Sequence, residues 1–451
     1  MTASAYRARC RPAVAAFLVA AVACTAPMDG DGGQPGPPRR PGSPSPDPRS
    51  PSPGAPSPSP GPVEVADHLH LELPGDGSFL VKGGYPRRPS PCVDAERPRL
   101  LARYPGDLSV ERSDDGTISL TVTVPFDRYL EGIAEVPPSW PAAALEAQAI
   151  AARSYALATT GWGGQEGEEL PTPICATAAC QVYRGIPVPR DPDVRAWYRA
   201  VRRTDGQVLL YRGRPAETVY FSTSNGRTYA NEDVFGSAPL PYLRPVVERD
   251  DGESPVSRWS VRLPFEDLAR FLGAAGEWPR HRGISDVVLE DGTVTVRGEG
   301  RSRSMDAATF RAAVNVWAPC LEPDRYPPPS WKGTELPVTV PSRWMSLSTE
   351  RDGVVAEGRG WGHGVGMVQW GAYGKALRGM SASDILAFYY GGLRPRRRPE
   401  PGLIHVEVAI GLRELKIVPS VPGATLEGRE LGLDRVTIEG GEALTVTVEP
   451  R

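Results

Sequence analysis

Glu135 has the neighbours that acid catalysis requires. The residues around it in the sequence are largely apolar and include Ile133, Val136, Pro137 and Trp140. Burial among such side chains disfavours the charged carboxylate and raises its pKa by up to several units, whereas the positive end of a following helix favours the carboxylate by under ~1 kcal/mol. We therefore predict that Glu135 holds a proton near neutral pH and can transfer it to a substrate. A solvated surface carboxylate at this position would not have that property.

A second unusual stretch is "GRGWGHGVGMVQWGA", residues 358–372, which contains six glycines, two tryptophans and His363. Glycine costs backbone entropy, and chains tolerate it mainly where φ is positive or where another backbone or a ligand approaches closely. The composition therefore predicts a shaped surface.

Two patterns indicate the elements that position Glu135. Residues 118–124 alternate apolar and polar side chains, which predicts a half-buried strand. Residues 142–159 are rich in alanine, with apolar positions at helical spacing, and Ser139 is available as an N-cap just upstream. Glu135 is therefore expected on a loop, just before a long helix.

Four blocks of sequence occur together and in a fixed order. They are "VPFDRYLEGIAEVPPSWPAAALEAQAIAARSYAL" (residues 124–157), "CQVYRG" (180–185), "VYFSTSNGRT" (219–228) and a block at 358–392 that contains "WGHGVGMVQWGA". Together these blocks resemble the sporulation protein SpoIID and its LytB relatives. The resemblance implies an α+β fold, with a two-lobed body and a substrate groove. Beyond Pro401, short stretches of alternating apolar and polar residues, separated by Gly and Pro, predict a small β-rich C-terminal appendage.

The family consists of cell-wall proteins, and its sporulation members are lytic transglycosylases that cut glycan strands of peptidoglycan, preferring strands stripped of peptides. The family's catalytic glutamate lies in a Glu-Met-Pro context before an alanine-rich helix. Glu135 to Pro137 match this context, with Val136 in place of methionine. The resemblance therefore implies the acid role for Glu135. An alternative is a wall-binding protein that does not cut and enhances an amidase.

The four blocks also contain candidate substrate-binding residues, whose aromatic faces and hydrogen-bonding groups suit a sugar polymer, and several of them have a structural alternative. His363 can hold its loop through main-chain carbonyls, the hydroxyl residues can satisfy their own hairpin, and a helical arginine can simply extend to solvent. The expected substrate-binding residues are Arg153, Ser222, Ser224, Thr228, Trp361, His363, Gln369 and Trp370. Neither serine lies in a Gly-x-Ser-x-Gly motif, which disfavours a serine hydrolase.

Six cysteines are present, four of them after residue 62. In an exported protein pairing is the default expectation. Cys175 and Cys180 are close enough to pair locally, which leaves Cys92 with Cys320, although the sequence does not fix the connectivity. Some sporulation members hold zinc near their paired cysteines, but here no histidine lies near Cys175, and two thiolates make a poor zinc site. We therefore expect a disulfide, no metal and no cofactor.

The chain divides by composition into four parts. Residues 1–24 resemble an export signal of the lipoprotein type, with Cys24 as the lipidated residue; an ordinary cleavage site is the alternative. Residues 25–62 are rich in Pro, Ser and Gly and predict a disordered stalk. Residues 63–396 form the expected body, with a second lobe at about 259–320, and residues 397–451 form a β-rich C-terminal module.

Charge and composition restrict the partners. The chain has 51 basic and 54 acidic residues and a net charge of −3. No cluster of Lys or Arg is interleaved with aromatic residues as a nucleic-acid groove requires, so nucleic acid is not an expected partner. The expected partners are peptidoglycan glycan strands and a cell-wall amidase. We expect an exported protein at the outer face of the cytoplasmic membrane or in the wall, held to the membrane only by an N-terminal lipid.

Overall fold

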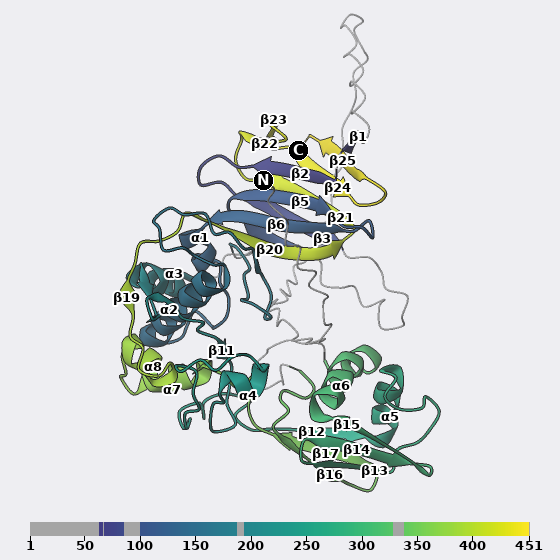
Figure 1. Cartoon of the computed structure of the whole chain (residues 1–451). Helices are drawn as coiled ribbons and strands as arrows, with labels where there is room; N and C mark the ends of the chain where they lie inside the picture. Colours follow the sequence, from purple (N-terminus) through teal and green to yellow (C-terminus); the bar gives the residue numbers. More distant parts are fainter. Residues whose placement is uncertain (1–62, 66, 85–99, 187–193, 328–337, 451) are drawn as a thin grey trace, which may run out of the picture.

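The computed structural model describes residues 63–65, 67–84, 100–186, 194–327 and 338–450 (Figure 1). The export signal, the lipidation candidate Cys24, the stalk and Cys92 lie outside the described residues. Within the described ranges, no helix combines the length and the hydrophobicity that a membrane span requires.

Two large sheets lie together at the top of Figure 1 and share one hydrophobic core. The six-stranded sheet has the order β1 (Val63–Val65), β25 (Leu444–Glu449), β24 (Arg435–Glu439), β21 (Glu414–Pro419), β3 (Phe79–Gly84), β4 (Leu100–Tyr104). The seven-stranded sheet has the order β23 (Arg429–Gly432), β22 (Ala424–Leu426), β2 (His68–Glu72), β5 (Asp107–Arg112), β6 (Ile118–Pro125), β20 (Leu403–Leu412), β7 (Ile174–Cys175).

The strand predicted at residues 118–124 is confirmed as β6. Its alternate residues Ile118, Leu120, Val122 and Val124 are fully buried in the core between the sheets. The short strands expected beyond residue 401 are also present, but they do not form an appendage. β20 pairs with β6, β21 with β3, and β25 with β1, so the C-terminal strands complete sheets that the N-terminal part begins. Their apolar residues are buried in that shared core, which explains the difference.

A helical layer lies next to the sheets (Figure 1). The predicted long helix is α2, which is buried along most of its length because its alanines let neighbouring elements pack closely. It begins after Pro141 with no side-chain cap, so the prediction of Ser139 as its N-cap is wrong. Proline, with φ preset near the helical value, enters the helix instead. The helices of this layer are α1 (Phe126–Glu131), α2 (Ala142–Thr159), α3 (Val194–Arg203), α7 (Gln369–Leu377) and α8 (Ala382–Tyr389).

Short elements connect these helices to the rest of the chain. They are β8 (Gln207–Val208), β9 (Leu210–Tyr211), β10 (Arg214–Pro215), β11 (Tyr220–Phe221), α4 (Asn231–Phe235), β18 (Met367–Val368) and β19 (Arg396–Arg397). Two of them matter for the site: β11 and β18 form a parallel pair, and β18 leads directly into α7.

A separate hydrophobic core lies at the lower right of Figure 1 and joins two three-stranded sheets and two helices. Its residues run from Val256 to Ala356, so this core extends past the boundary expected near residue 320, because β17 pairs with β12 and β16 pairs with β17. The elements are β12 (Trp259–Pro264), α5 (Phe265–Ala274), β13 (Asp286–Glu290), β14 (Thr293–Gly298), β15 (Arg301–Asp306), α6 (Ala307–Leu321), β16 (Met345–Thr349) and β17 (Gly353–Gly358). The described chain as a whole is of the α+β class.

Candidate active site

Four segments that are distant in the sequence meet at Glu135. Residues 132–134 run beside residues 182–184, where Ala134 N donates to Val182 O at 2.8 Å and Arg184 N donates to Gly132 O at 2.9 Å. The pair of β11 and β18 supplies the other two segments. Each segment belongs to one of the four sequence blocks, so the blocks describe one place in the fold.

The carboxyl group of Glu135 is held by one of its oxygens. The backbone N–H of Val182 donates to Oε1 at 2.6 Å, and the hydroxyl of Tyr220 donates to the same oxygen at 3.3 Å. Both of these hydrogen bonds fall on Oε1. Burial raises the pKa of Glu135, and this effect exceeds the opposing effects of the hydrogen bonds from Val182, Tyr220 and Gln369 and of the charge on Arg184.

Tyr220 is the last donor in a chain of neutral side chains. Tyr129 donates to Gln181 Oε1 at 2.7 Å, Gln181 Nε2 donates to the Tyr220 hydroxyl at 2.9 Å, and Tyr220 donates to Glu135. The second N–H of Gln181 is held by Ala152 O at 3.1 Å, which fixes the amide orientation. Burial raises the pKa of both tyrosines, so they stay protonated and every donor in the chain points toward Glu135.

Gln369 lies beside Glu135, but it contacts the main chain of Glu135. Its Nε2 is 3.4 Å from Glu135 O and 3.4 Å from Gln148 Oε1 on α2. The Gln369 side chain is buried, as is that of Gln148. Gln369 therefore ties the loop of Glu135 to the first turn of α7, a contact that stabilises the site more than it offers a polar group to a ligand.

His363 holds its own loop. Its Nε2 donates to Tyr220 O at 2.9 Å, and its Nδ1 accepts from Val365 N at 3.1 Å. Burial lowers the pKa of His363 to about 4, so the ring is neutral at physiological pH. Both ring nitrogens of His363 are hydrogen-bonded to main-chain atoms. This is the structural alternative stated for His363, and it contradicts the expectation that the ring binds substrate.

The glycines of residues 358–372 let two backbones approach each other. Gly366 has φ +76°, and a Cβ there would lie 2.0 Å from Val219 O; Gly360 has φ +77°, and a Cβ there would lie 2.6 Å from Thr223 O. The glycine-rich stretch is therefore shaped to fit residues 219–224.

The two tryptophans of the glycine-rich stretch have different neighbours. The Trp370 ring packs on Trp140 with a centroid distance of 4.9 Å and on Tyr373 at 5.2 Å, and it is partly exposed. Trp140 follows Glu135 in the same loop, so Trp370 lies next to the site. Trp361 is partly buried, pairs with Thr223 through main-chain hydrogen bonds and packs on the second core.

Two of the three predicted hydroxyl residues are bound within the fold by residues of the following segment, 246–251. Ser224 is buried, and both its N–H and its hydroxyl donate to Asp251 Oδ2, at 2.8 Å and 2.7 Å. Thr228 is also buried, and its hydroxyl accepts from Val246 N at 2.9 Å. The substrate-binding prediction is therefore wrong for these two residues, because they are buried and bound within the fold. Ser222 is partly buried, and its hydroxyl contacts only the Thr223 hydroxyl, at 3.1 Å, among the described residues.

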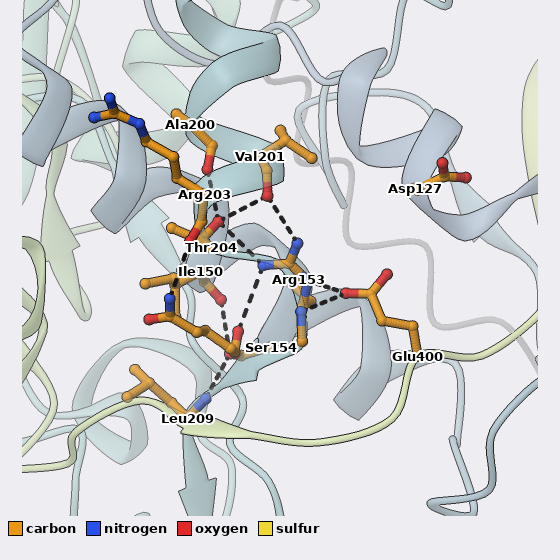
Figure 2. A network of polar contacts seen from close by, with 12 residues as sticks. Asp127, Ile150, Arg153, Ser154, Ala200, Val201, Arg203, Thr204, Leu209 and Glu400 are labelled. Atoms are coloured by element: carbon orange, nitrogen blue, oxygen red, sulfur yellow. Dashed lines mark hydrogen bonds and ion pairs between the residues drawn. The ribbon is translucent and has the colours of Figure 1, made fainter.

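Arg153 is a structural residue. It is only 1% exposed, and its Nε donates to Glu400 Oε1 at 2.7 Å, while its other nitrogens reach Val201 O and the hydroxyl of Thr204 (Figure 2). Figure 2 shows the guanidinium enclosed by α2, the end of α3 and the segment that carries Glu400. The prediction that Arg153 binds substrate is wrong, because substrate has no access to a side chain buried in this way.

A disulfide joins Cys175 to Cys180. It lies immediately before Gln181 and Val182, the residues that donate hydrogen bonds within the Glu135 cluster. Cys320 lies in α6 and Cys92 lies outside the described residues, so the pairing of these two cysteines stays a prediction.

Sequence reasoning missed four residues that surround Glu135: Gln181, Val182, Arg184 and Tyr220. All four belong to the blocks that carry the resemblance. The sequence feature that could have indicated them is the presence of polar residues between apolar ones in "CQVYRG" and "VYFS". Their roles come from a tertiary contact, which the sequence does not display.

Comparisons with known proteins agree with this arrangement of blocks. The family model described as SpoIID, stage II sporulation protein, matches residues 114–211, which include Glu135 and the disulfide. An uncharacterized protein of Brachyspira hyodysenteriae is 29% identical over 59% of this chain and 66% of its own length. The amidase enhancer of Bacillus subtilis is 28% identical over 57% of this chain and 38% of its own length.

A third relative, the stage II sporulation protein D of Bacillus subtilis, is 25% identical over 65% of this chain and 79% of its own length. The chain thus spans a little under two thirds of the Brachyspira protein and well under half of the amidase enhancer. The match to the family model over residues 114–211, the named relatives and the four blocks that meet at Glu135 together support the SpoIID/LytB family for this chain.

Proposed function

We propose that this protein is a cell-wall lytic transglycosylase that cleaves peptidoglycan glycan strands, with Glu135 as its single acid and base. The observation that supports the proposal is that the two carboxyl oxygens of Glu135 have different surroundings. Oε1 accepts from Val182 N and Tyr220, whereas Oε2 is the oxygen left to carry a proton toward a ligand. The raised pKa keeps that proton in place at higher pH than for an ordinary glutamate.

In the first step the proton on Oε2 moves to the glycosidic oxygen while the bond from that oxygen to C1 of muramic acid breaks. In the second step the C6 hydroxyl of the same sugar attacks C1, and its proton moves to the Glu135 carboxylate. The product carries a 1,6-anhydro ring, and Glu135 regains its proton. Because the sugar supplies the nucleophile, a second carboxylate of the kind that most glycosidases use is unnecessary.

The donors on Oε1 serve both steps. While Glu135 is an acid they direct the proton to Oε2, because Oε1 already accepts two hydrogen bonds. After proton transfer they stabilise the carboxylate, since hydrogen bonds to an ionised acceptor are stronger than those to a neutral one. Tyr220 suits this role because its raised pKa keeps it a donor throughout.

The proposed substrate is glycan strands stripped of peptides, and the proposed place of action is the cell wall or the outer face of the cytoplasmic membrane. Of the residues expected to contact the glycan, Trp370, Trp361 and Ser222 keep exposed surface, and Trp370 is next to the Glu135 loop. The proposed lipid anchor is Cys24, the stalk would span residues 25–62, and the proposed body begins near residue 63.

The second candidate function is binding to the wall without cutting, in support of an amidase. The similarity to a protein named amidase enhancer favours it. In that case Glu135 would be a buried structural group, and its substitution would change stability and not product formation.

The test is to incubate the purified chain with peptide-free glycan strands and to measure anhydro-muramyl ends by mass spectrometry. Glu135→Gln should abolish their release and keep strand binding, because the amide preserves shape without supplying a proton. Glu217→Gln is the matched control, since Glu217 is an exposed carboxylate three residues before Tyr220. Strand binding with no release by the unaltered chain would overturn the proposal in favour of the helper function.

A further inference from the structure

The outer surface of α3 carries an unusual concentration of positive charge. The helix buries Trp197, Ala200 and Val201 and turns its arginines to solvent. Arg202 and Arg203 are about seven-tenths exposed, and Arg195 and Arg199 are exposed as well. Figure 2 shows the Arg203 side chain extending away from the buried Arg153 network.

A second set of arginines comes from the other end of the chain. β19 pairs with β8, which follows α3, so that Arg396 lies opposite Val208 and Arg397 opposite Gln207; Arg398 N donates to Gly206 O at 2.8 Å. All three of these arginines are exposed. We call the two sets together the arginine surface; its members are Arg195, Arg199, Arg202, Arg203, Arg396, Arg397 and Arg398.

Acidic neighbours neutralise only part of this charge. Glu131 and Glu146 lie 3.7 Å from Arg202 and Arg203, and Asp205 is exposed nearby in the chain. Glu400 is already paired with the buried Arg153. Among the described residues, the seven arginines of this surface thus exceed these acidic neighbours and leave a local excess of positive charge, in a chain whose net charge is −3.

The shape of the arginine surface favours an extended ligand. Arg195 to Arg203 span about 12 Å of helix, and residues 396–398 add about 7 Å of extended chain at its end. A small anion would use one or two of these side chains, whereas a linear polyanion can use all of them. Guanidinium groups bind phosphate oxygens in paired hydrogen bonds, so repeated phosphodiesters fit this array.

A membrane fits less well. Among the described residues, the large hydrophobic side chains that are exposed lie elsewhere, and none is in α3 or β19. An interfacial helix needs such side chains in order to insert.

The arginine surface lies close to the candidate active site. Its members Arg199 and Arg203 line a small pocket together with Trp140, and the Trp140 ring packs on Trp370 beside that site.

We propose that the arginine surface binds a linear phosphodiester polymer, which would hold the protein in an anionic layer while its carboxylate site stays accessible. This inference does not depend on glycan cleavage. The probe is fluorescently labelled poly(glycerol phosphate), and the readout is its anisotropy with the full chain at 50 and 200 mM salt. Binding should weaken steeply with salt, as expected for ligands that release counterions.

The variant Arg199→Gln/Arg202→Gln/Arg203→Gln should bind at least about tenfold more weakly, and the slope of log affinity against log salt should fall by about two to three. Arg396→Gln/Arg397→Gln should also weaken binding, because it removes charge without altering the backbone pairing of β19. The matched control, Arg297→Gln/Arg301→Gln/Arg303→Gln, removes three exposed arginines from β14 and β15 and should bind like the unaltered chain.

Equal losses in the α3 variant and in the control would overturn the proposal, because the effect would then be one of net charge. Tighter binding to phosphatidylglycerol vesicles or to duplex DNA than to poly(glycerol phosphate) would also overturn it and would assign the surface to that partner. Circular dichroism of each variant establishes that a loss of binding is not a loss of folding.

Discussion

Helix α2 carries two polar clusters that differ in how their charges are balanced. In one, the Arg153 guanidinium meets the Glu400 carboxylate at 2.7 Å, so each charge has an opposite charge beside it (Figure 2). In the other, Gln148 and Ala152 O contribute to a cluster in which the hydrogen-bond donors to the Glu135 carboxyl are all neutral. A carboxylate that is paired with an opposite charge stays ionised and has a structural role. A buried carboxyl group whose hydrogen-bond donors are neutral can change its protonation state.

The strongest test of this difference between the two clusters is to replace the Glu135 and Glu400 carboxyl groups in turn. Glu135→Gln should lower the rate of anhydro-end formation by about 10³-fold or more, since a positioned acid contributes ~10²–10⁴-fold and here one group serves both steps. Glu400→Gln should leave the rate per folded molecule unchanged. Comparable loss of rate in both variants, measured on folded protein, would contradict the distinction.

Arg153 should matter for stability alone. Arg153→Met leaves Glu400 without its partner and should lower the free energy of unfolding by about 3–5 kcal/mol, as measured by urea denaturation. The double variant Arg153→Met/Glu400→Gln should recover part of that loss, because no unpaired charge remains. A change in kcat without a change in stability would assign Arg153 a role in catalysis.

Substitution of Tyr220 tests the role of the hydrogen-bond donors around Glu135. Tyr220→Phe removes one donor to Oε1 and should lower kcat roughly tenfold. The hydrogen bond lowers the pKa of Glu135, so its loss should raise that pKa further. Activity needs protonated Glu135 and falls as pH rises through its pKa; in Tyr220→Phe this fall should occur at higher pH. A pH profile that keeps its position would show that Tyr220 only packs.

His363 offers a smaller effect, visible in stability against pH. Its folded pKa of about 4 lies below the ordinary value of 6.5, so the unfolded chain binds more protons between these values. Stability should therefore decrease as pH falls from about 6.5 to about 4, and His363→Gln should make this decrease shallower. Thermal unfolding from pH 4 to pH 7 measures it, and an identical slope in the variant would contradict the assignment.

The smallest effect is expected from the disulfide. Cys175→Ser/Cys180→Ser should reduce kcat roughly two- to fivefold, because the disulfide closes a short loop just before Gln181 and Val182, and short loops give modest stabilisation. The decrease should appear in kcat, with only a modest change in the free energy of unfolding. A protein that no longer folds would show that the disulfide supports the whole fold and not the site.

Local patterns predicted local structure well. The alternation in residues 118–124 and the alanine spacing in residues 142–159 predicted β6 and α2, and the loop position of Glu135 follows from them. The position of Arg153 within α2 was also predictable, but its burial against Glu400 was not, because these residues are 247 positions apart.

The donors to Glu135 were beyond sequence reasoning for the same reason. Val182 N acts through its backbone, which no side-chain pattern reveals, and Tyr220 reaches Glu135 across 85 positions. The glycines of residues 358–372 were correctly associated with close approach, but the approaching group is the backbone of residues 219–224. Sequence alone does not distinguish a ligand from a neighbouring segment.

The pairing of β25 with β1 and of β21 with β3 has a kinetic consequence. These strand partners are separated by more than 300 positions, so the six-stranded sheet cannot close until almost the whole polypeptide has left the ribosome. Such distant contacts make folding slow. The nascent chain therefore stays unfolded and extended for longer. A chain built this way remains competent for passage through a narrow secretion channel for longer than one whose ends fold early.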